Sequence, residues 1–266
     1  MSKNIDLNLF EKEISSSKNE IFTEIKKRAL DKLRDTGVPN KSHENWKYTD
    51  ISRPMELVHE YLTDNKNEKD LKLSSSSTAV NEIDAHWINL NEISLKSEFA
   101  INAEDVDINI SLLSSSKENF EIQINDPISC LNALLIKDVV KITIPKNSSI
   151  KKPLGIVWTD SPKQNDFCSN LRCIIDIGEN SNINLINIFQ NGINEEYFIN
   201  SVMEIDIAKN SNLEYLKIQN FSSNHHSIDR CLINLDTNAS INFNNIDIGS
   251  KLSRSDVEVN LNQKGA

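Results

Sequence analysis

The sequence lacks a long apolar run and lacks closely spaced cysteines. No N-terminal segment resembles a signal peptide, and no stretch approaches the length of a membrane span, so we expect a cytoplasmic protein. The four cysteines are scattered and form no Cys-x-x-Cys pair, which argues against a structural zinc site. In a reducing compartment we expect them to be free thiols: Cys130, Cys168, Cys173 and Cys231.

A glycine-rich phosphate loop of the Walker type is also missing, so ATP chemistry would have to belong to a partner. Acidic residues outnumber basic ones by 39 to 29, which gives a net charge of −10. This excess argues against broad binding to nucleic acids or anionic membranes. Apolar residues make up 38% of the chain, a low share that still allows the narrow core of a solenoid.

What the sequence does contain is a repeat in its second half. The pattern is apolar-x-apolar, a polar turn rich in Asn and Ser, and apolar-x-apolar again. It is clearest at 175–185, 205–215 and 233–243, weaker at 142–150, and begins once more at 259–266. The turn centres fall at 147, 180, 210, 238 and about 264, so the period shortens from 33 residues to about 26.

Alternation with a period of two is typical of a strand with one buried face, and Asn tolerates the left-handed backbone of a tight turn. Self-similarity at this period indicates stacked units that cannot bury their apolar faces alone. The pattern therefore favours a mainly β fold, a parallel β-helix over 131–266. A meander of β-hairpins is the alternative, although its connections would more often be two-residue Asn-Gly or Asp-Gly loops.

The N-terminal region, 1–60, is predicted to begin with a helix that ends near Gly37. Ser17 and Glu20 have the spacing of a capping box, and an apolar stripe follows at helical spacing over 21–33. Lys26 and its basic neighbours lie off this stripe, and we interpret them as a solvated face.

The segment 43–51 is then predicted to be a loop whose Trp46 and Tyr48 dock on the body of the protein. Residues 61–80 have little to bury and are predicted to be a flexible linker. The segment 81–130 is interpreted as a mixed α/β lead-in, with a strand at 85–90. The run 131–136 is predicted to be a short helical turn that leads into the first coil.

Candidate site residues are few. His225 and His226 form the single histidine pair, but adjacent strand residues point to opposite faces, so they are weak metal candidates and a solvated loop is expected. Cys173 and Cys231 share the apolar parity of their strands and are expected in the core. Arg254 and Asp256 share one strand face, where Arg254 is predicted to tie neighbouring coils together.

Two separated motifs carry a resemblance to a known family. The segment 44–50, Glu-Asn-Trp-Lys-Tyr-Thr-Asp, resembles the N-terminal signature of the SufD branch of the SufB/SufD family, which serves iron–sulfur cluster assembly. The segment 249–256 and the Gly265-Ala266 end resemble that family's core motif. The family-motif residues are Glu44, Trp46, Lys47, Tyr48, Asp50, Gly249, Arg254, Asp256 and Gly265.

The resemblance implies a right-handed parallel β-helix behind an N-terminal helical region. It implies a noncatalytic scaffold that works with SufB and the ATPase SufC, with the iron–sulfur cluster belonging to the full complex and no cofactor bound by this chain. Family members continue past Ala266, so the β-helix is expected to be incomplete at its C-terminal end. The partner-docking regions and a candidate cluster-ligand histidine would lie beyond it.

Two other function classes remain open. The β-helix fold often carries carbohydrate-active enzymes such as lyases and esterases, and it also serves as an interaction module. The enzyme would need a groove with clustered acids or basic residues on adjacent coils, and both alternatives usually involve export. We expect the outward residues of successive repeats not to line up as acids.

Overall fold

The computed structural model describes residues 5–17, 19–63, 83–90, 99–103, 106–113, 120–159, 168–190, 196–263 and 265. It is mainly β, with a β-solenoid of about four turns at residues 140–261 and a few N-terminal helices, as the sequence predicted. Of the predicted linker, residues 61–63 instead belong to a helix, and the remainder lies outside the described residues.

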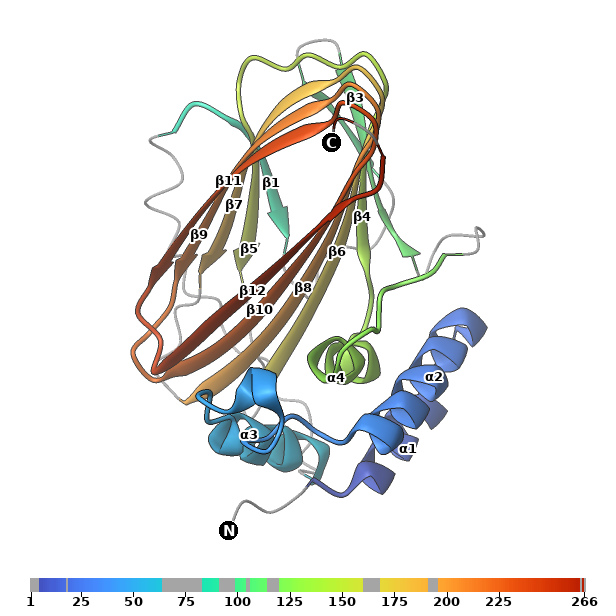
Figure 1. The fold of residues 1–266 in the computed structure, drawn as a ribbon, viewed down its shortest axis with the longest axis vertical. Coiled ribbons are helices and arrows are strands. Elements are labelled where there is room, and N and C mark those ends of the chain that lie inside the picture. Colours follow the sequence, from blue (N-terminus) through green and yellow to red (C-terminus); the bar gives the residue numbers. More distant parts are fainter. Residues whose placement is uncertain are drawn as a thin grey trace.

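The solenoid consists of two sheets that share its coils (Figure 1). One sheet has five strands in the order β1-β5-β7-β9-β11, and the other has seven in the order β12-β10-β8-β6-β4-β3-β2. All pairs are parallel except β2–β3 and β3–β4, which are antiparallel. The strands are β1 (His86–Leu90), β2 (Phe99–Ala103), β3 (Val106–Leu112), β4 (Val140–Ile144), β5 (Leu154–Thr159), β6 (Cys168–Ile177), β7 (Asn182–Gln190), β8 (Tyr197–Ile207), β9 (Asn212–Asn220), β10 (His225–Leu235), β11 (Ser240–Ile248) and β12 (Leu252–Leu261).

Each coil passes from the seven-stranded sheet to the five-stranded sheet through the predicted asparagine turn. Asn147, Asn180, Asn210 and Asn238 all have φ between 54° and 62°, the left-handed region that Asn tolerates better than most residues. Their side chains form a ladder from coil to coil, because the amide of Asn210 donates to Asn180 at 3.0 Å and that of Asn180 donates to Asn147 at 3.2 Å. The turn therefore fixes both the local backbone and the stacking register.

The residue after each of these asparagines turns inward. The backbone N–H of Ser148 donates to Ser181 Oγ at 3.1 Å, and the N–H of Ser181 donates to Ser211 Oγ at 3.0 Å. These buried serines satisfy backbone groups that the turn would otherwise leave without partners. The inward-pointing residues of successive strands stack in rows that fill the lumen, such as the row Ile142, Ile175, Ile205 and Ile233.

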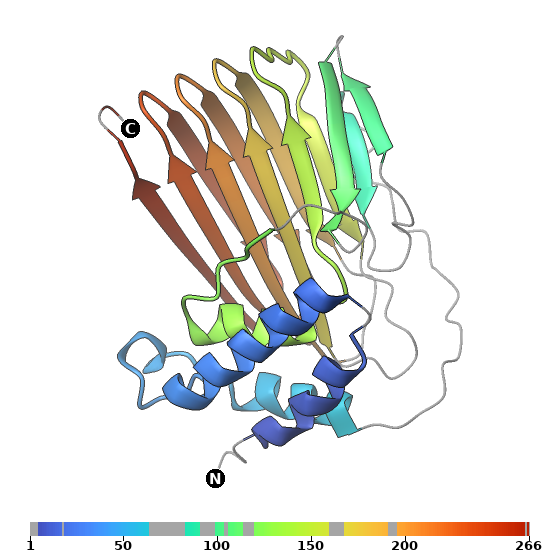
Figure 2. The same cartoon turned by 90° about the vertical axis from the view of Figure 1, so that its right-hand side faces the viewer.

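The N-terminal helices form a layer against the outer face of the seven-stranded sheet (Figure 2). They are α1 (Phe10–Ser15), α2 (Glu20–Thr36), α3 (Ser52–Thr63) and α4 (Pro127–Leu135), with short 3₁₀ segments η1 (Leu7–Leu9) and η2 (Glu44–Trp46). Apolar residues of these helices pack with the outward side chains of Ile174, Phe198 and Ile228 in a second core. The outward positions that the helices cover are thus buried, whereas outward positions near the asparagine turns, such as Asp176 and Asp206, are partly or fully exposed.

Three local predictions for the helical layer need correction. The cap of α2 is Asn19, whose side chain accepts from the N–H groups of Ile21 and Phe22, rather than the predicted Ser17 capping box. Lys26, predicted to be solvated, is buried, and this burial lowers the pKa of its amine. Helix α4 is longer than the predicted single turn and is capped by Asp126.

Candidate functional site

The two family-like motifs, far apart in the sequence, meet at one junction. Arg254 on β12 stacks its guanidinium on the ring of Trp46, with 4.0 Å between Cζ and the ring centroid. Its Nη1 donates to the carbonyl oxygen of Asn45 at 2.6 Å and to Thr49 Oγ1 at 3.0 Å. A planar guanidinium suits this combination of stacking and forked donation, which a lysine could not reproduce.

Arg254 therefore holds the N-terminal motif loop; over the described residues its hydrogen bonds run to this loop and along its own strand, and not to a neighbouring coil as predicted. Its Nε also donates to Asp256 at 2.9 Å, which confirms that the two side chains share one strand face. Trp46 is buried at the junction, as predicted, but Tyr48 is 91% exposed and does not dock. The amine of Lys47, also exposed, lies 5.5 Å from the centre of the Tyr48 ring.

The remaining motif residues shape turns around this junction. Asp50 pairs with Lys41 at 2.7 Å, and this contact, with the N–H of Ser52, holds the pKa of its carboxyl below the usual range. Glu44 is exposed in η2. Gly249 has φ of +77°, and a Cβ there would come 1.9 Å from the carbonyl oxygen of Phe221, so only glycine fits.

Gly265 lies beside the last of the asparagine turns. Its φ is +79°, and an added Cβ would approach Asn238 Oδ1 to 2.6 Å, so a side chain at this position would be strained. Gly249 and Gly265 are thus glycines for steric reasons that the sequence motif alone did not reveal.

A charged cluster centred on Glu196 lies at the start of β8. Its carboxylate is 2.8 Å from Arg53 Nε on α3, 3.0 Å from His226 Nε2 on β10 and 3.1 Å from Lys251 Nζ. The hydrogen bond from His226, followed by those from Arg53 and Lys251, lowers the pKa of Glu196 to about 2. Glu196 therefore links the helical layer to β10 and to Lys251, which directly precedes β12.

The histidine pair lies on a strand and not in the solvated loop that the sequence suggested. Both residues are buried at the start of β10 and, as expected, point to opposite faces. His225 lies between the rings of Tyr197 and Phe221, with 5.9 Å between centroids in each case. Among the described residues, no group of three or more His, Cys, Asp or Glu side chains could hold a metal ion.

The end of the lumen opposite the asparagine turns is polar. Asp229 accepts from Lys217 Nζ at 2.6 Å, Ser201 Oγ at 2.8 Å and Ser255 Oγ at 3.3 Å. Both members of the Lys217–Asp229 pair have side chains that are 2% exposed. The three donors come from β9, β8 and β12, so one carboxylate joins successive coils from within.

Two smaller networks extend this polar end. Asn187 accepts from the indole N–H of Trp158 at 2.7 Å and donates to the hydroxyl of Tyr215 at 2.8 Å, and burial raises the pKa of Tyr215. Gln219 accepts from Ser227 at 2.7 Å and donates to Ser253 at 3.1 Å. The alternation in the sequence could have located Lys217 and Asp229 in the lumen. Lys217 lies two residues from the inward-pointing Tyr215, and Asp229 lies two residues from the inward-pointing Cys231.

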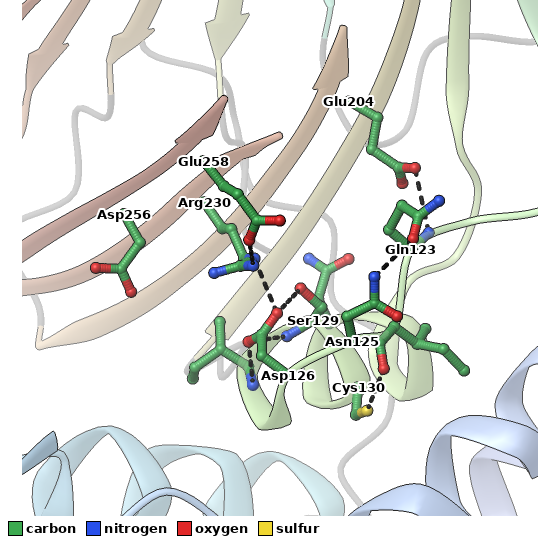
Figure 3. Close-up of polar contacts among 12 residues, drawn as sticks. Gln123, Asn125, Asp126, Ser129, Cys130, Glu204, Arg230, Asp256 and Glu258 are labelled. Atoms are coloured by element: carbon green, nitrogen blue, oxygen red, sulfur yellow. Dashed lines mark hydrogen bonds and ion pairs between the residues drawn. The ribbon is translucent and has the colours of Figure 1, made fainter. Parts of the chain in front are cut away.

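Outside the lumen, ion pairs fasten α4 to the strands (Figure 3). Arg230 lies between Asp126 and Glu258, at 2.8 Å and 2.6 Å. Asp126 also caps α4, accepting from the N–H groups of Ile128 and Ser129. The carboxylate of Asp256 lies apart from this group, as the close-up shows.

A buried arginine makes a parallel attachment nearby. Arg172 on β6 pairs with Glu204 on β8 at 2.6 Å and donates to Asn132 of α4 and to the carbonyl oxygen of Gln123. The side chain of Arg172 is fully buried, so removing either charge would leave the other without compensation.

Contrary to expectation, two acids do line up on adjacent coils. Asp176 and Asp206 are register partners on the outer face of β6 and β8, and both line an open hollow of about 520 Å³. Each is engaged, however, since Asp176 pairs with Lys141 at 3.1 Å and Asp206 accepts from Asn234 at 2.7 Å. The arrangement continues the side-chain ladders of the solenoid, because Asn260 donates in turn to Asn234.

The cysteines are buried, and Cys173 and Cys231 occupy the lumen core as predicted. Burial raises the pKa of both thiols and raises that of Cys130 to about 11. Because the thiolate is the reactive form, these side chains act as core hydrophobes.

Comparison with models of known protein families gives a match to the C-terminal part of the chain. Residues 159–266 match the model of the SufBD core domain of the SUF system for iron–sulfur cluster assembly. This match supports the resemblance of the chain to the SufB/SufD family. It implies involvement in SUF iron–sulfur cluster assembly but does not distinguish SufD from SufB. A search of curated proteins found no match.

The matched segment covers strands β6 to β12, which carry Lys217 and Asp229 of the polar lumen, Glu196 and Arg254. The N-terminal motif that Arg254 holds lies outside the match. Over the described residues, no helix is long and apolar enough to cross a membrane.

Proposed function

We propose that this chain is a noncatalytic scaffold subunit of the SUF iron–sulfur cluster assembly complex, of the SufD type, acting with a SufB-like paralogue and a SufC-like ATPase. The observation that carries the proposal is the SufBD core match over 159–266. The SufD assignment rests on the Trp46-Lys47-Tyr48 motif, and its support is the contact that this loop makes with Arg254 of the matched core.

The chemistry of the site supports a structural role. The carboxylates of Asp229, Glu196 and Asp126 each serve as acceptors for several protein donors, and the cysteines of the core are buried. Carboxylates that are already hydrogen-bonded within the protein, and buried thiols, suit a rigid scaffold on which partner proteins assemble the cluster. ATP hydrolysis is expected from the SufC-like partner.

The test is co-expression of this chain with the SufB-like and SufC-like proteins of the same genome. We expect one complex that contains all three, with ATPase activity that requires the SufC-like subunit. Omitting this chain should reduce iron–sulfur cluster yield in anaerobic reconstitution. A SufB–SufC complex that forms and loads clusters equally well with or without it would contradict the proposal.

A second measurement tests the noncatalytic assignment. The purified chain alone should hydrolyse no ATP and should retain no stoichiometric iron after reconstitution. An oxygen-sensitive cluster on the isolated chain, lost in a His225→Ala and His226→Ala double variant, would show that the histidine pair is a ligand set after all.

A further inference from the structure

A hollow of about 510 Å³ opens beside the motif loop 44–50. Its walls come from three segments: the start of the described chain at Ile5, the turn 38–42, and residues 49–52 with Met55, where the motif loop leads into α3. Sites for small molecules have volumes of about 300–1,000 Å³. The hollow is therefore large enough for a small ligand.

The floor of the hollow is apolar. Ile5, Ile51 and Met55 line it and belong to the core of the helical layer, against which Val38 also packs. The first three residues are at most 6% exposed, so the core behind them fixes their side chains in place. A ligand would meet a small and rigid apolar surface, which suits a single aliphatic side chain.

The rim of the hollow carries two opposite charges side by side. Lys41 Nζ lies 2.7 Å from Asp50 Oδ2, and both side chains are more than half exposed. The other carboxylate oxygen, Asp50 Oδ1, accepts from the N–H of Ser52 at 3.0 Å. The backbone therefore holds the carboxylate so that Oδ2 is presented to a cation, whereas the amine of Lys41 ends a flexible stem that can change its partner.

The two walls that carry these charges are each closed by their own hydrogen bonds. In the turn, Asn40 Oδ1 accepts from the N–H of Ser42 at 2.8 Å, and the N–H of Asn40 donates to His43 Nδ1 at 3.2 Å. On the opposite wall, the N–H of Met55 donates to the carbonyl oxygen of Ile51 at 3.0 Å. The hollow is thus formed in advance, which reduces the entropy that binding must remove.

The charges at the rim favour a ligand that carries both an ammonium and a carboxylate. A lone carboxylate would take Lys41 and meet Asp50 as a like charge, and a lone amine would take Asp50 and meet Lys41. In an α-amino acid the two charges are adjacent, as they are at the rim. We propose that the hollow binds a free α-amino acid with an aliphatic side chain, whose ammonium binds Asp50, whose carboxylate binds Lys41 and whose side chain contacts the apolar floor.

The proposed site is connected to the solenoid through Thr49. This residue lines the hollow, and its Oγ1 accepts from Arg254 Nη1 at 3.0 Å. Arg254 in turn stacks on Trp46 of the same loop. A ligand in the hollow should therefore hold the motif loop more firmly on β12 and slow the hydrogen exchange of its amides.

The experiment is calorimetric titration of the purified chain with L-leucine and three analogues. N-acetyl-L-leucine keeps only the carboxylate charge, L-leucine amide keeps only the ammonium charge, and glycine keeps both charges but lacks the side chain. We expect saturable binding of one L-leucine per chain and at least tenfold weaker binding of each analogue. Because all four probes are applied to the wild-type protein, this comparison does not depend on the folding of a variant.

Variants at the rim test the location of the site. Lys41→Gln and Asp50→Asn should each weaken L-leucine binding at least tenfold, and an asparagine at 50 can still accept from the N–H of Ser52. Lys47→Gln and Glu44→Gln are the matched controls, since they make the same charge changes at exposed positions of the motif loop that do not line the hollow. Both controls should bind like the wild type, and circular dichroism would confirm that all four variants fold.

Four results would overturn the proposal. The first is the absence of saturable L-leucine binding up to about 10 mM. The second is an analogue with one charge that binds as tightly as L-leucine, and the third is glycine that does so. The fourth is a pair of rim variants that bind no more weakly than their matched controls. None of these results bears on the SUF proposal, which is tested with the partner proteins.

Hydrogen exchange gives a second readout on the same protein. Saturating L-leucine should slow exchange at residues 45–49 in the wild type and leave it unchanged in Asp50→Asn. Equal slowing in both proteins would place the bound amino acid elsewhere and would also count against the proposal.

Discussion

The two ends of the lumen are built on different principles. At the asparagine-turn end, rows of isoleucine stack from coil to coil, and the turns satisfy their own backbone groups through Asn and Ser ladders. At the opposite end, Lys217, Asp229 and Gln219 occupy positions of the same inward parity and are satisfied by side chains of neighbouring coils. One end uses repetition, and the other uses a specific set of partners.

This difference affects how each end holds the fold. An apolar row contributes through burial, which is roughly proportional to area and tolerates changes of shape. A buried ion pair contributes little net stability, yet removing one partner leaves a charge without compensation. The polar end should therefore be the more sensitive to single substitutions.

The largest loss is expected from Asp229→Ala. It leaves the amine of Lys217, buried in the lumen, without its counter-charge and removes the acceptor of Ser201. Breaking a buried pair in this way costs about 3–5 kcal/mol of unfolding free energy, measurable by urea denaturation.

The matched control for Asp229→Ala replaces both charges, as Lys217→Met with Asp229→Leu. Because the desolvation of both groups is then avoided, the double variant should recover most of the loss. A double variant that is as unstable as Asp229→Ala alone would show that the polar end depends on the ion pair itself.

At the apolar end, Ile205→Ala tests the stacked row. Ile205 is fully buried between Ile175 and Ile233, and its truncation opens a cavity in the lumen. The expected loss is about 2–4 kcal/mol in the same urea measurement. Ile205→Val should lose about 1 kcal/mol. If Ile205→Ala lost as much unfolding free energy as Asp229→Ala, the contrast between the two ends would disappear.

The sequence was informative about the repeating end because each signal there is local. Period-two alternation located β6 to β11, and the turn asparagines that it singled out all have positive φ. The expected core positions of Cys173 and Cys231 followed from the same parity. In these cases, one coil's sequence contains the whole physical cause.

What the sequence missed depends on contacts between distant residues. Tyr48 and Trp46 look alike as aromatic residues of one loop, but only Trp46 meets Arg254, which lies on β12. The buried Lys26 and the strand position of His226 likewise follow from the packing of the helical layer and from Glu196. No local pattern encodes such pairings, because the partner is absent from the segment.

A smaller effect is expected at the asparagine turns themselves. Asn210 has φ of 57°, and an alanine in that conformation costs about 1–2 kcal/mol. Asn210→Gly should remain within about 0.5 kcal/mol of the wild type, since glycine adopts positive φ without strain although it loses the ladder contacts. Equal losses for the two variants would mean that the ladder, and not the backbone, stabilises this end.

The smallest effect is expected from Glu196→Gln, beside the polar end. The pKa of Glu196 is lowered to about 2, so its contribution to stability is present above its ordinary pKa, near 4.5, and is lost as the pH falls through about 2. At neutral pH the variant should be less stable by at most about 1 kcal/mol, because Arg53 and Lys251 are partly solvated.

The pH dependence of Glu196→Gln isolates this cluster from the other carboxylates. Between pH 4.5 and about pH 2.5 the wild type should lose more unfolding free energy than the variant, since only the wild type protonates Glu196 there. Glu56→Gln is the matched control, because Glu56 also pairs with Arg53 but is half exposed and away from His226. The Glu56→Gln variant retains Glu196 and should therefore keep the loss of unfolding free energy that is assigned to Glu196. If the Glu196→Gln curve ran parallel to that of the wild type, the contacts that join α3 to β10 would be independent of this carboxylate's charge.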